Sequence, residues 1–419
     1  MITAAIIAEY NPFHSGHQYH IEETRRMTGA DYVVVVMSGD FVQRGEPAVA
    51  DKYVRSRMAL LGGADVVIEL PVYYASASAE YFASAGVRLL TKLGCVNYLS
   101  FGSEWADISD YEVYTDVLIK EPELYKEVLG RELKAGKNFA SARSAALFTC
   151  LKRADFGDTD PAVFLAQPNH ILGLEYLKAL RRMQSEIIPL TVKREGAGYH
   201  DHVFGKGHPS ASAVRRKLRE VDWKKEQEML KRAMPAGAKP FLRRYRERDF
   251  VSWDDLMPLL DYYLLMNGEE KKNFFGVDKD LFMRIQKNYE PGMPFHEIIR
   301  RLHTKRLTDA ALRRALLHIL LQMEHYPFLN RASQVLVPYA RVLGFTKKAL
   351  PLLKKMREKA SLDIMQRPVE GMRKYVPDSP EGLLYKADIK AAALYEQTAA
   401  RKSGRSPQEE LTRQQIIIE

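Results

Sequence analysis

Short apolar runs alternate with helix-like stretches along the first half of the chain. The runs are rich in Val, Ile and Leu and contain few charges, as in strands that are buried on both faces. They span residues 2–8, 31–39, 65–71, 96–103 and 186–194. Apolar residues recur at helical spacing between them, over residues 52–63, 76–93 and 169–183. This alternation predicts an α/β fold, a doubly wound parallel sheet whose ligands bind beyond the carboxyl ends of the strands.

Beyond Asp222 the strand signals fade, and Leu, Ala, Lys, Arg and Glu recur at helical spacing. A chain of 419 residues is longer than one typical hydrophobic core, which makes two domains the natural expectation. We therefore expect a domain over residues 1–222 that contains the sheet, followed by an α-helical domain over residues 223–419. Within the second domain, one helix is expected to begin at Lys305 and another to end at Gly344.

The segment Asn11-Pro12-Phe13-His14-Ser15-Gly16-His17 lies between the first apolar run and a helical pattern. Pro12 stops the strand because it cannot donate to the ladder, and Gly16 lets the main chain approach a ligand closely. Free N–H groups and the helix dipole favour an anion at such a helix start. His14 and His17 stand three residues apart there, positioned to donate to phosphate oxygens.

These residues suit attack on the α-phosphorus of a nucleotide, where negative charge builds on the phosphate oxygens as pyrophosphate leaves. Imidazole N–H groups stabilise that charge without a covalent step. The chain has no Walker lysine and no G-x-G-x-x-G here, which excludes the usual P-loop and dinucleotide patterns. In the structural alternative, His14 only caps the helix and His17 is a surface histidine.

A second segment, His208-Pro209-Ser210-Ala211-Ser212-Ala213-Val214-Arg215, opens a helix late in the predicted sheet domain. Ser210 is expected to cap that helix, with Arg215 one turn further on. Two hydroxyls and a guanidinium at a helix start suit the β- and γ-phosphates of ATP. Together the two segments resemble the HxGH signature and the I-S-S-T-x-x-R-type signature of the nucleotidyltransferase superfamily. Because Ser-Ala-Ser replaces adjacent hydroxyls, the sequence leaves open whether Ser210 or Ser212 meets phosphate.

Further stretches resemble the tRNA(Met) cytidine acetate ligase family over nearly the whole chain. They are IIAEYNPFHSGHQYH, VVMSGDFVQRGEPA, GADVVIELPV, FGSE, QPNHILGLEYLKAL, VKREGAGYHD and RASQVLVPYARVLGF. The resemblance implies that ATP activates acetate as acetyl-adenylate, and that the acetyl group passes to the wobble cytidine of elongator tRNA(Met) to give 4-acetylcytidine. It makes His14 and His17 the expected catalytic residues. Mg²⁺ is expected with the triphosphate, although no dedicated carboxylate cage is evident.

The residues implied to contact ATP belong to the two phosphate segments or follow the carboxyl ends of predicted strands. They are Ile7, Ala8, Glu9, Tyr10, Asn11, Pro12, Phe13, His14, Ser15, Gly16, His17, Gln18, Tyr19, His20, Gly102, Asn169, Arg194, Ser210, Ser212 and Arg215. Three of them have structural alternatives by pattern: Gly102 as a turn glycine, Asn169 as a helix cap and Arg194 as a surface arginine. The loop after the second strand either contacts acetate and the cytidine or only packs, through Gln43, Arg44 and Glu46.

A net charge of +10 and a pI near 9.2 favour a polyanionic partner, since Lys and Arg that meet phosphates release counterions. A solvated basic surface is the plainer alternative. Residues 239–248 alternate aromatic rings with guanidinium groups, which suits RNA. The candidate tRNA contacts are Arg243, Arg244, Arg246, Lys305, Arg306, Lys347 and Lys348.

Two cysteines, Cys95 and Cys150, lie far apart without CxxC spacing, which indicates a reducing compartment and offers no zinc site. No signal peptide and no bilayer-spanning stretch is evident, so a cytoplasmic protein without a membrane partner is expected. The sequence leaves the oligomeric state open. It also leaves two rival functions: an enzyme that adenylylates a small phosphorylated metabolite, and a non-catalytic RNA-binding protein.

Overall fold

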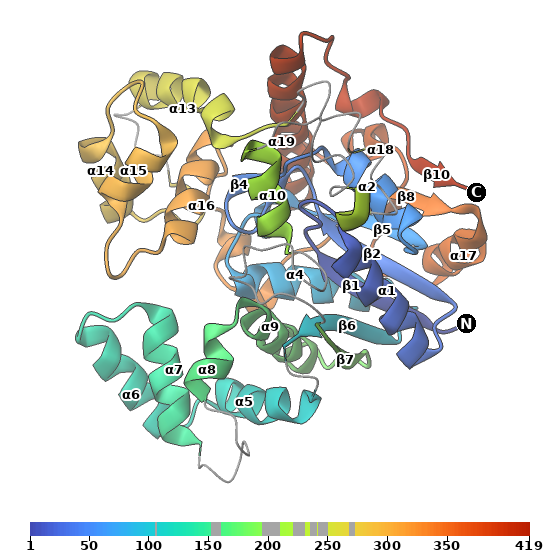
Figure 1. The fold of residues 1–419 in the computed structure, drawn as a ribbon, viewed down its shortest axis with the longest axis horizontal. Helices are drawn as coiled ribbons and strands as arrows, with labels where there is room; N and C mark the ends of the chain where they lie inside the picture. The colour runs from blue at the N-terminus through green and yellow to red at the C-terminus, as the bar shows by residue number, and fades with distance from the viewer. Residues whose placement is uncertain are drawn as a thin grey trace.

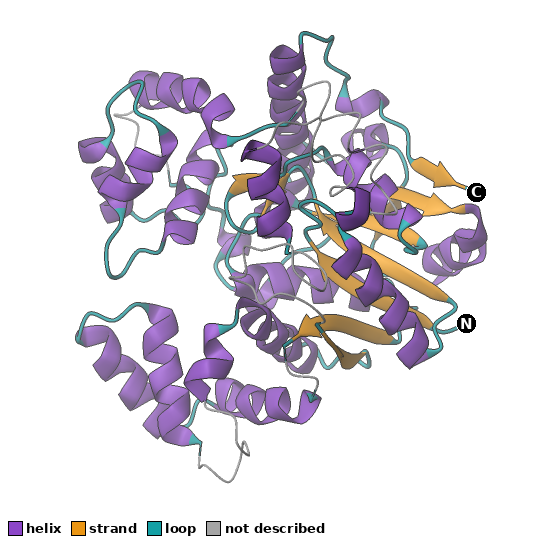
Figure 2. Cartoon of the chain, in the orientation of Figure 1, coloured by secondary structure: helices purple, strands orange, loops and turns teal. Residues whose placement is uncertain are grey.

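The computed structural model describes residues 1–104, 107–151, 161–194, 210–220, 231–234, 241, 250–267 and 273–419. Within these residues, eight strands form one sheet at the centre of the molecule (Figures 1 and 2). They are β1 (Thr3–Ala8), β2 (Tyr32–Ser38), β5 (Val66–Leu70), β6 (Tyr98–Ser103), β7 (Ile188–Lys193), β8 (Tyr339–Thr346), β9 (Asp363–Met365) and β10 (Ile416–Ile418). Their order is β10-β8-β5-β2-β1-β6-β7, with β9 beside β8.

The part of the sheet from β5 to β7 is parallel. β1 pairs with β2 and β6, β2 pairs with β5, and β6 pairs with β7. Alternate residues point to opposite faces, and both sets are buried: Val34 and Val36 face one layer of helices, Val33 and Val35 the other. The five predicted strands and the doubly wound sheet are thus confirmed.

Helices cover both faces of this sheet. The helices on the side of Val33 and Val35 are α1 (Ser15–Thr28) and α2 (Lys52–Leu61). Those on the other side are α4 (Ala79–Lys92) and α9 (Pro168–Arg182). The helices predicted from periodicity correspond to α2, α4 and α9, with the short α3 (Val72–Ala75) before α4. The two periodicities of the sequence therefore place residues 9–14 between a buried strand and a half-buried helix.

Two helical groups lie on the side of the sheet toward which the parallel strands point (Figure 1). One group consists of α5 (Ile108–Lys120), α6 (Glu123–Lys134), α7 (Phe139–Cys150) and α8 (Pro161–Ala166). The other consists of α13 (Trp253–Asn267), α14 (Lys279–Asn288), α15 (Phe295–Leu302) and α16 (Asp309–Leu320). In the second group Trp253 stacks on Phe295, with ring centroids 4.2 Å apart, inside a separate apolar cluster.

The remaining elements connect these parts. The α-helices are α10 (Ala211–Glu220), α17 (Leu350–Lys359), α18 (Pro368–Lys374) and α19 (Pro380–Ser403). The 3-10 turns are η2 (Pro327–Leu329), η3 (Ala332–Gln334), η4 (Lys347–Ala349) and η5 (Glu410–Thr412). A small antiparallel hairpin, β3 (Phe41–Val42) and β4 (Glu46–Pro47), follows β2. In the described part of the chain, no helix is both long and apolar enough to cross a membrane.

The C-terminal region is mainly helical, but its described part also contributes three strands, β8, β9 and β10, to the sheet. β8 pairs antiparallel with β5, and β9 and β10 pair with β8. The prediction that a helix ends at Gly344 is wrong, because β8 is a buried strand there. Gly344 instead permits close strand approach, since a Cβ at this position would lie 2.6 Å from the Ile416 carbonyl oxygen. The helix expected from Lys305 begins later, at Asp309, where Thr308 caps α16. The division at residue 222 into two domains stays a prediction.

Four buried charged residues form an ionic cluster where β5, β8, α2 and η5 meet. The Lys52 ammonium lies 2.8 Å from Glu69 and 2.7 Å from Glu410. The Arg341 guanidinium lies 3.0 Å from Glu69 and also pairs with Glu410. All four side chains are at most 7% exposed. The cluster joins residues that are more than 300 positions apart in sequence.

Candidate active site

The loop after β1 ends in a helix cap made by two histidines. His14 is the N-cap of α1, and its Nδ1 accepts a hydrogen bond from the Gly16 N–H at 3.1 Å. The Nδ1 of His17 accepts from the His14 N–H at 3.2 Å, which completes a reciprocal capping box. The two rings stack with centroids 3.7 Å apart and planes at 22°. The capping alternative is therefore confirmed for His14, and the catalytic role of both histidines stays a prediction.

These hydrogen bonds select one tautomer of each neutral imidazole. Because Nδ1 is an acceptor in both rings, the ring proton of the neutral form is on Nε2. Burial lowers the pKa of His17 well below its usual value, and the nearby charges of His14 and Arg194 lower it further. His17 is thus a neutral Nε2–H donor near pH 7, which is the form that can donate to a phosphate oxygen without carrying charge.

His20, one turn further along α1, is held against the sheet. Its Nε2 lies 3.0 Å from the Ser100 hydroxyl of β6. Burial, assisted by the charge of Arg194, lowers the pKa of His20 to about 4. The charge of Arg194 therefore acts on both histidines of α1, His17 and His20.

A fully buried arginine fixes the main chain beneath the loop. Arg55 of α2 donates to the carbonyl oxygens of Glu9 at 2.8 Å and Ser38 at 3.0 Å, and to those of Gly39 and Ala50. The Asn11 side-chain oxygen accepts from the Val49 N–H at 2.8 Å. One guanidinium thus ties the ends of β1 and β2 to the start of α2.

The second phosphate segment meets the first. Ser210 Oγ accepts from the Ala213 N–H at 3.2 Å and lies 3.0 Å from Ser212 Oγ, which confirms Ser210 as the cap of α10. Arg215 donates to the Asn11 carbonyl oxygen at 2.7 Å. The two signatures are about 200 positions apart in sequence, and this contact brings them together at one edge of the sheet. His208 and Pro209 lie outside the described residues.

Glu104, directly after β6, contacts two of the predicted residues, Asn169 and Arg194. Its Oε1 accepts from the Asn169 amide at 2.7 Å and lies 3.7 Å from Arg194 Nε. His170 Nε2 lies 3.0 Å from its other oxygen. The Arg194 side chain passes over Gly102, where an added Cβ would lie 3.4 Å from Arg194 Cγ. Burial raises the pKa of Glu104, but these hydrogen bonds and the charge of Arg194 lower it more, so that the carboxylate is ionised.

The cap alternative for Asn169 is wrong. Helix α9 begins at Pro168, with Gln167 as its N-cap and no side-chain cap, so Asn169 already lies within the first turn. Its side chain is therefore available to Glu104. Glu104 is the residue that the sequence prediction missed, although a carboxylate directly after a buried strand, at the edge where ligands bind, was a usable signal.

The hairpin after β2 links Glu9, directly after β1, to the helices of the C-terminal region. Glu9 accepts from the Gln43 N–H at 2.9 Å, and burial raises the pKa of Glu9 against the opposing charges of Arg44 and Arg215. At the other end, Glu46 pairs with Arg313 of α16. Loop packing accounts for these contacts of Gln43 and Glu46, and contact of the loop with acetate or cytidine stays a prediction.

The predicted tRNA contacts fall in three places. Arg243, Arg244 and Arg246 lie outside the described residues. Lys305 and Arg306 are exposed between α15 and α16, and Arg306 reaches within 4.0 Å of a Cβ built on Gly136, in the other helical group. The remaining pair, Lys347 and Lys348, lies at the opposite edge of the sheet, where one lysine pairs with Glu419 and the other donates to the Asp31 carbonyl.

Comparison with known sequences identifies full-length relatives. The sequence matches the HIGH nucleotidyl transferase family over residues 1–410. It is 36% identical to a tRNA(Met) cytidine acetate ligase of Acetivibrio thermocellus over 424 aligned residues, which cover 100% of both chains. A tRNA(Met) cytidine acetate ligase of Caldanaerobacter subterraneus subsp. tengcongensis is also 36% identical, over 94% of this chain and 95% of the relative.

Two crystal structures of Thermotoga maritima TmcAL have a similar fold. The apo form superposes with a TM-score of 0.90 at 31% identity, and each chain is covered completely. The form bound to alpha-thio ATP superposes with a TM-score of 0.85 at 30% identity, again over 100% of both chains. A protein with this whole-chain architecture therefore binds an ATP analogue.

Proposed function

Because the chain belongs to the tRNA(Met) cytidine acetate ligases of the HIGH nucleotidyl transferase family, we propose that it activates acetate with ATP and acetylates the wobble cytidine of elongator tRNA(Met). An acetate oxygen attacks the α-phosphorus, pyrophosphate leaves, and acetyl-adenylate forms. The exocyclic amine of the cytidine then attacks the acetyl carbon, AMP leaves and the amine loses a proton.

The main support for this proposal is the contact between the two signature segments, in which Arg215 donates to the Asn11 carbonyl oxygen. The stacked His14 and His17 of the same loop each use Nδ1 as an acceptor within the cap, which leaves Nε2–H of each ring to donate beside the start of α1. Charge that develops on the α-phosphate and on the departing pyrophosphate is stabilised by such fixed donors, because they need no reorganisation during the reaction. His14 and His17 are therefore assigned to the α-phosphate and Arg215 to the distal phosphates.

Two further groups complete the proposed ATP site. Since Ser210 Oγ already accepts from the α10 main chain, Ser212 is the hydroxyl assigned to phosphate. Gly102 leaves room for the nucleoside, and Glu104 orients Asn169 and Arg194 toward it.

Mg²⁺ is proposed to accompany the triphosphate. In the described part of the chain, no group of three His, Cys, Asp or Glu side chains could hold a metal ion, whereas the hydroxyls of Ser210 and Ser212 are oxygen donors that Mg²⁺ accepts. The ion would neutralise phosphate charge. In this proposal His14, His17, Ser212 and Arg215 bind and orient the nucleotide.

The tRNA is proposed to approach from the side where the two helical groups lie (Figure 1). Lys305 and Arg306 are exposed there and suit the phosphodiester backbone. Since its substrate would be a tRNA, we place the enzyme in the cytoplasm.

ATP–pyrophosphate exchange with and without acetate tests the first half-reaction. Acetate-dependent exchange is expected in the wild-type protein and a loss of at least about 100-fold in His17→Ala, the size associated with removing one donor to a developing oxyanion. His296→Ala, an exposed histidine on α15, is the matched control and should exchange at the wild-type rate.

Other outcomes identify the rivals. Exchange that needs a phosphomonoester and ignores acetate would point to an adenylyltransferase acting on a small metabolite. tRNA binding without exchange, and unchanged in His17→Ala, would point to a non-catalytic RNA-binding protein.

A further inference from the structure

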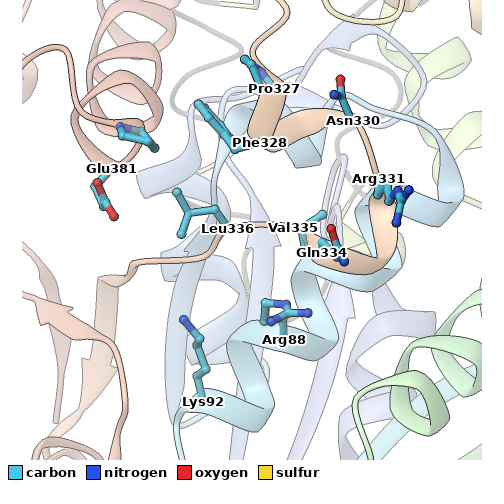
Figure 3. Close-up of a pocket in the computed structure, with 11 residues that line it drawn as sticks. Arg88, Lys92, Pro327, Phe328, Asn330, Arg331, Gln334, Val335, Leu336 and Glu381 are labelled. Atoms are coloured by element: carbon cyan, nitrogen blue, oxygen red, sulfur yellow. The ribbon is translucent and has the colours of Figure 1, made fainter.

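A cavity lies between α4, the segment 327–336 and the start of α19, and no residue of the His14–His17 loop lines it (Figure 3). Its volume is about 540 Å³, within the roughly 300–1,000 Å³ range of small-molecule sites. Three cationic side chains line it: Arg88, Lys92 and Arg331. We refer to this cavity as the α4 pocket.

Arg88 and Lys92 are like charges one helical turn apart, and Figure 3 shows both reaching from α4 toward the segment 327–336. Both are half-buried. Arg88 donates to the Ser333 carbonyl at 3.0 Å, and Lys92 to the Val337 carbonyl at 3.1 Å. Each group has more N–H donors than these single acceptors use, and the Arg88 Nε–H is buried without an acceptor among the described residues.

No carboxylate forms an ion pair with any of the three cations within the part of the chain that the structure describes. Burial lowers the pKa of both Arg88 and Lys92, and for Lys92 the charge of Arg88 lowers it further. Like charges at this helical spacing destabilise a helix, more so when they are partly removed from water. An anion between them would remove this cost. Glu381 at the far side of the pocket offsets only one of the three charges.

The other wall supplies a flat apolar surface with polar neighbours. Phe328 is half-buried and stacks on Tyr326, with centroids 5.5 Å apart and planes at 8°. Asn330 and Gln334 stand beside it, each with an amide that can both donate and accept. Arg88 and Lys92 on α4, opposite an aromatic ring with two amides, match a phosphate group joined to a nucleobase.

We propose that the α4 pocket binds a nucleotide, with its phosphate on Arg88 and Lys92 and its base against Phe328, while Arg331 adds positive charge to the lining. The nucleotide is either free or part of an RNA strand, and the RNA form rests on the proposed function above.

Hydrogen–deuterium exchange of the full-length protein locates the ligand, with AMP alone and tRNA(Met) alone as probes. Amides in residues 327–337 are expected to exchange at least about threefold more slowly when the pocket is filled. The test variant is Lys92→Gln combined with Arg331→Gln, because a glutamine amide keeps an N–H donor for the Val337 carbonyl while the charge is lost. It should lose this protection and keep AMP-dependent protection of residues 9–20. Lys390→Gln, an exposed lysine on α19, should behave as wild type.

The two probes separate the two sources. Protection by AMP indicates a free nucleotide, and protection by tRNA(Met) alone indicates a nucleotide of the RNA. No protection with either probe, or protection that persists in the double variant, overturns the proposal. Acetate-dependent pyrophosphate exchange of the double variant, expected at the wild-type rate, reports separately on folding and on the proposed function.

Discussion

At the residue scale, Glu104 is the group that holds Asn169 and Arg194, the two residues proposed to contact the nucleoside. Replacing it in Glu104→Gln removes the charge that holds Asn169 and Arg194 while preserving shape. A hydrogen bond to a charged group contributes about 1.5–3 kcal/mol, so we expect the KM for ATP to rise at least about tenfold in the pyrophosphate-exchange assay. Glu22→Gln, an exposed glutamate of α1, is the control. An unchanged KM would mean that Glu104 does not orient these residues.

His20 provides a prediction about pH. Its pKa is about 4 in the folded protein and about 6.5 when unfolded, so the unfolded chain takes up a proton first as the pH falls. The stability that neutral His20 contributes is complete above pH 6.5 and is lost as the pH falls toward 4. Allowing for partial solvent exposure, His20→Gln should reduce the loss of unfolding free energy between pH 7 and pH 5 by about 1 kcal/mol. Urea titrations at both pH values measure it, and equal losses in the two proteins would contradict it.

The local sequence pattern was sufficient to predict where His14 and His17 lie. It was insufficient to predict which side chains from distant parts of the chain meet at the site. A strand, a proline, a glycine and an imidazole pair are contiguous in sequence, and their placement could be predicted. The contacts of Glu104 span 65 positions or more, and the Asn169 cap prediction failed because α9 starts one residue earlier. Which side chains meet across the sheet depends on tertiary packing, and a short sequence segment does not determine that packing.

At the element scale, the β3–β4 hairpin connects Glu9 to the second helical group. Trp253 donates to the Gly45 carbonyl at 2.9 Å, and a Cβ at Gly45 would overlap the main chain of α16 at Arg314. Gly45 also has φ +72°, which disfavours any side chain.

Gly45→Ala should therefore push α16 away from the hairpin. We expect acetate-dependent pyrophosphate exchange to fall less than about twofold, and acetyl transfer to tRNA to fall at least tenfold. Gly130→Ala, in α6 with open space around the glycine, should change neither. Equal losses in both half-reactions would show that the hairpin serves ATP chemistry alone.

The strands that are buried on both faces could be predicted because a short, continuous apolar run fits few structures other than a buried strand. β8 was missed because its Gly344 resembles a helix end, and only the neighbouring β10 explains why a glycine is needed there. The sequence of β8 is an apolar run, but the strand it pairs with, β5, lies about 270 positions earlier. The pairing therefore could not be predicted from the local sequence.

At the scale of the whole molecule, the ionic cluster fastens the C-terminal region to the catalytic sheet. Glu410 pairs with both Lys52 and Arg341. Burial raises the pKa of Glu410, but these two cations lower it more, so that its pKa is about 2. Glu410→Gln leaves buried positive charge uncompensated, which should lower the free energy of unfolding by about 3–5 kcal/mol. Glu409→Gln, its exposed neighbour, is the control in the same urea titration. A loss below about 1 kcal/mol would show that water or another group compensates the cations.

The position of β8 in the sheet also governs how the chain can fold as it is made. β5 is complete at Leu70, but its partner begins at Tyr339, so 268 residues must be translated between them. At about 5–20 residues per second, the unpaired edge of β5 is exposed on the ribosome for roughly 15–50 s. An open edge of apolar strand is prone to pair with other nascent chains. The topology that joins the two ends of this enzyme therefore makes a holding chaperone useful during its synthesis.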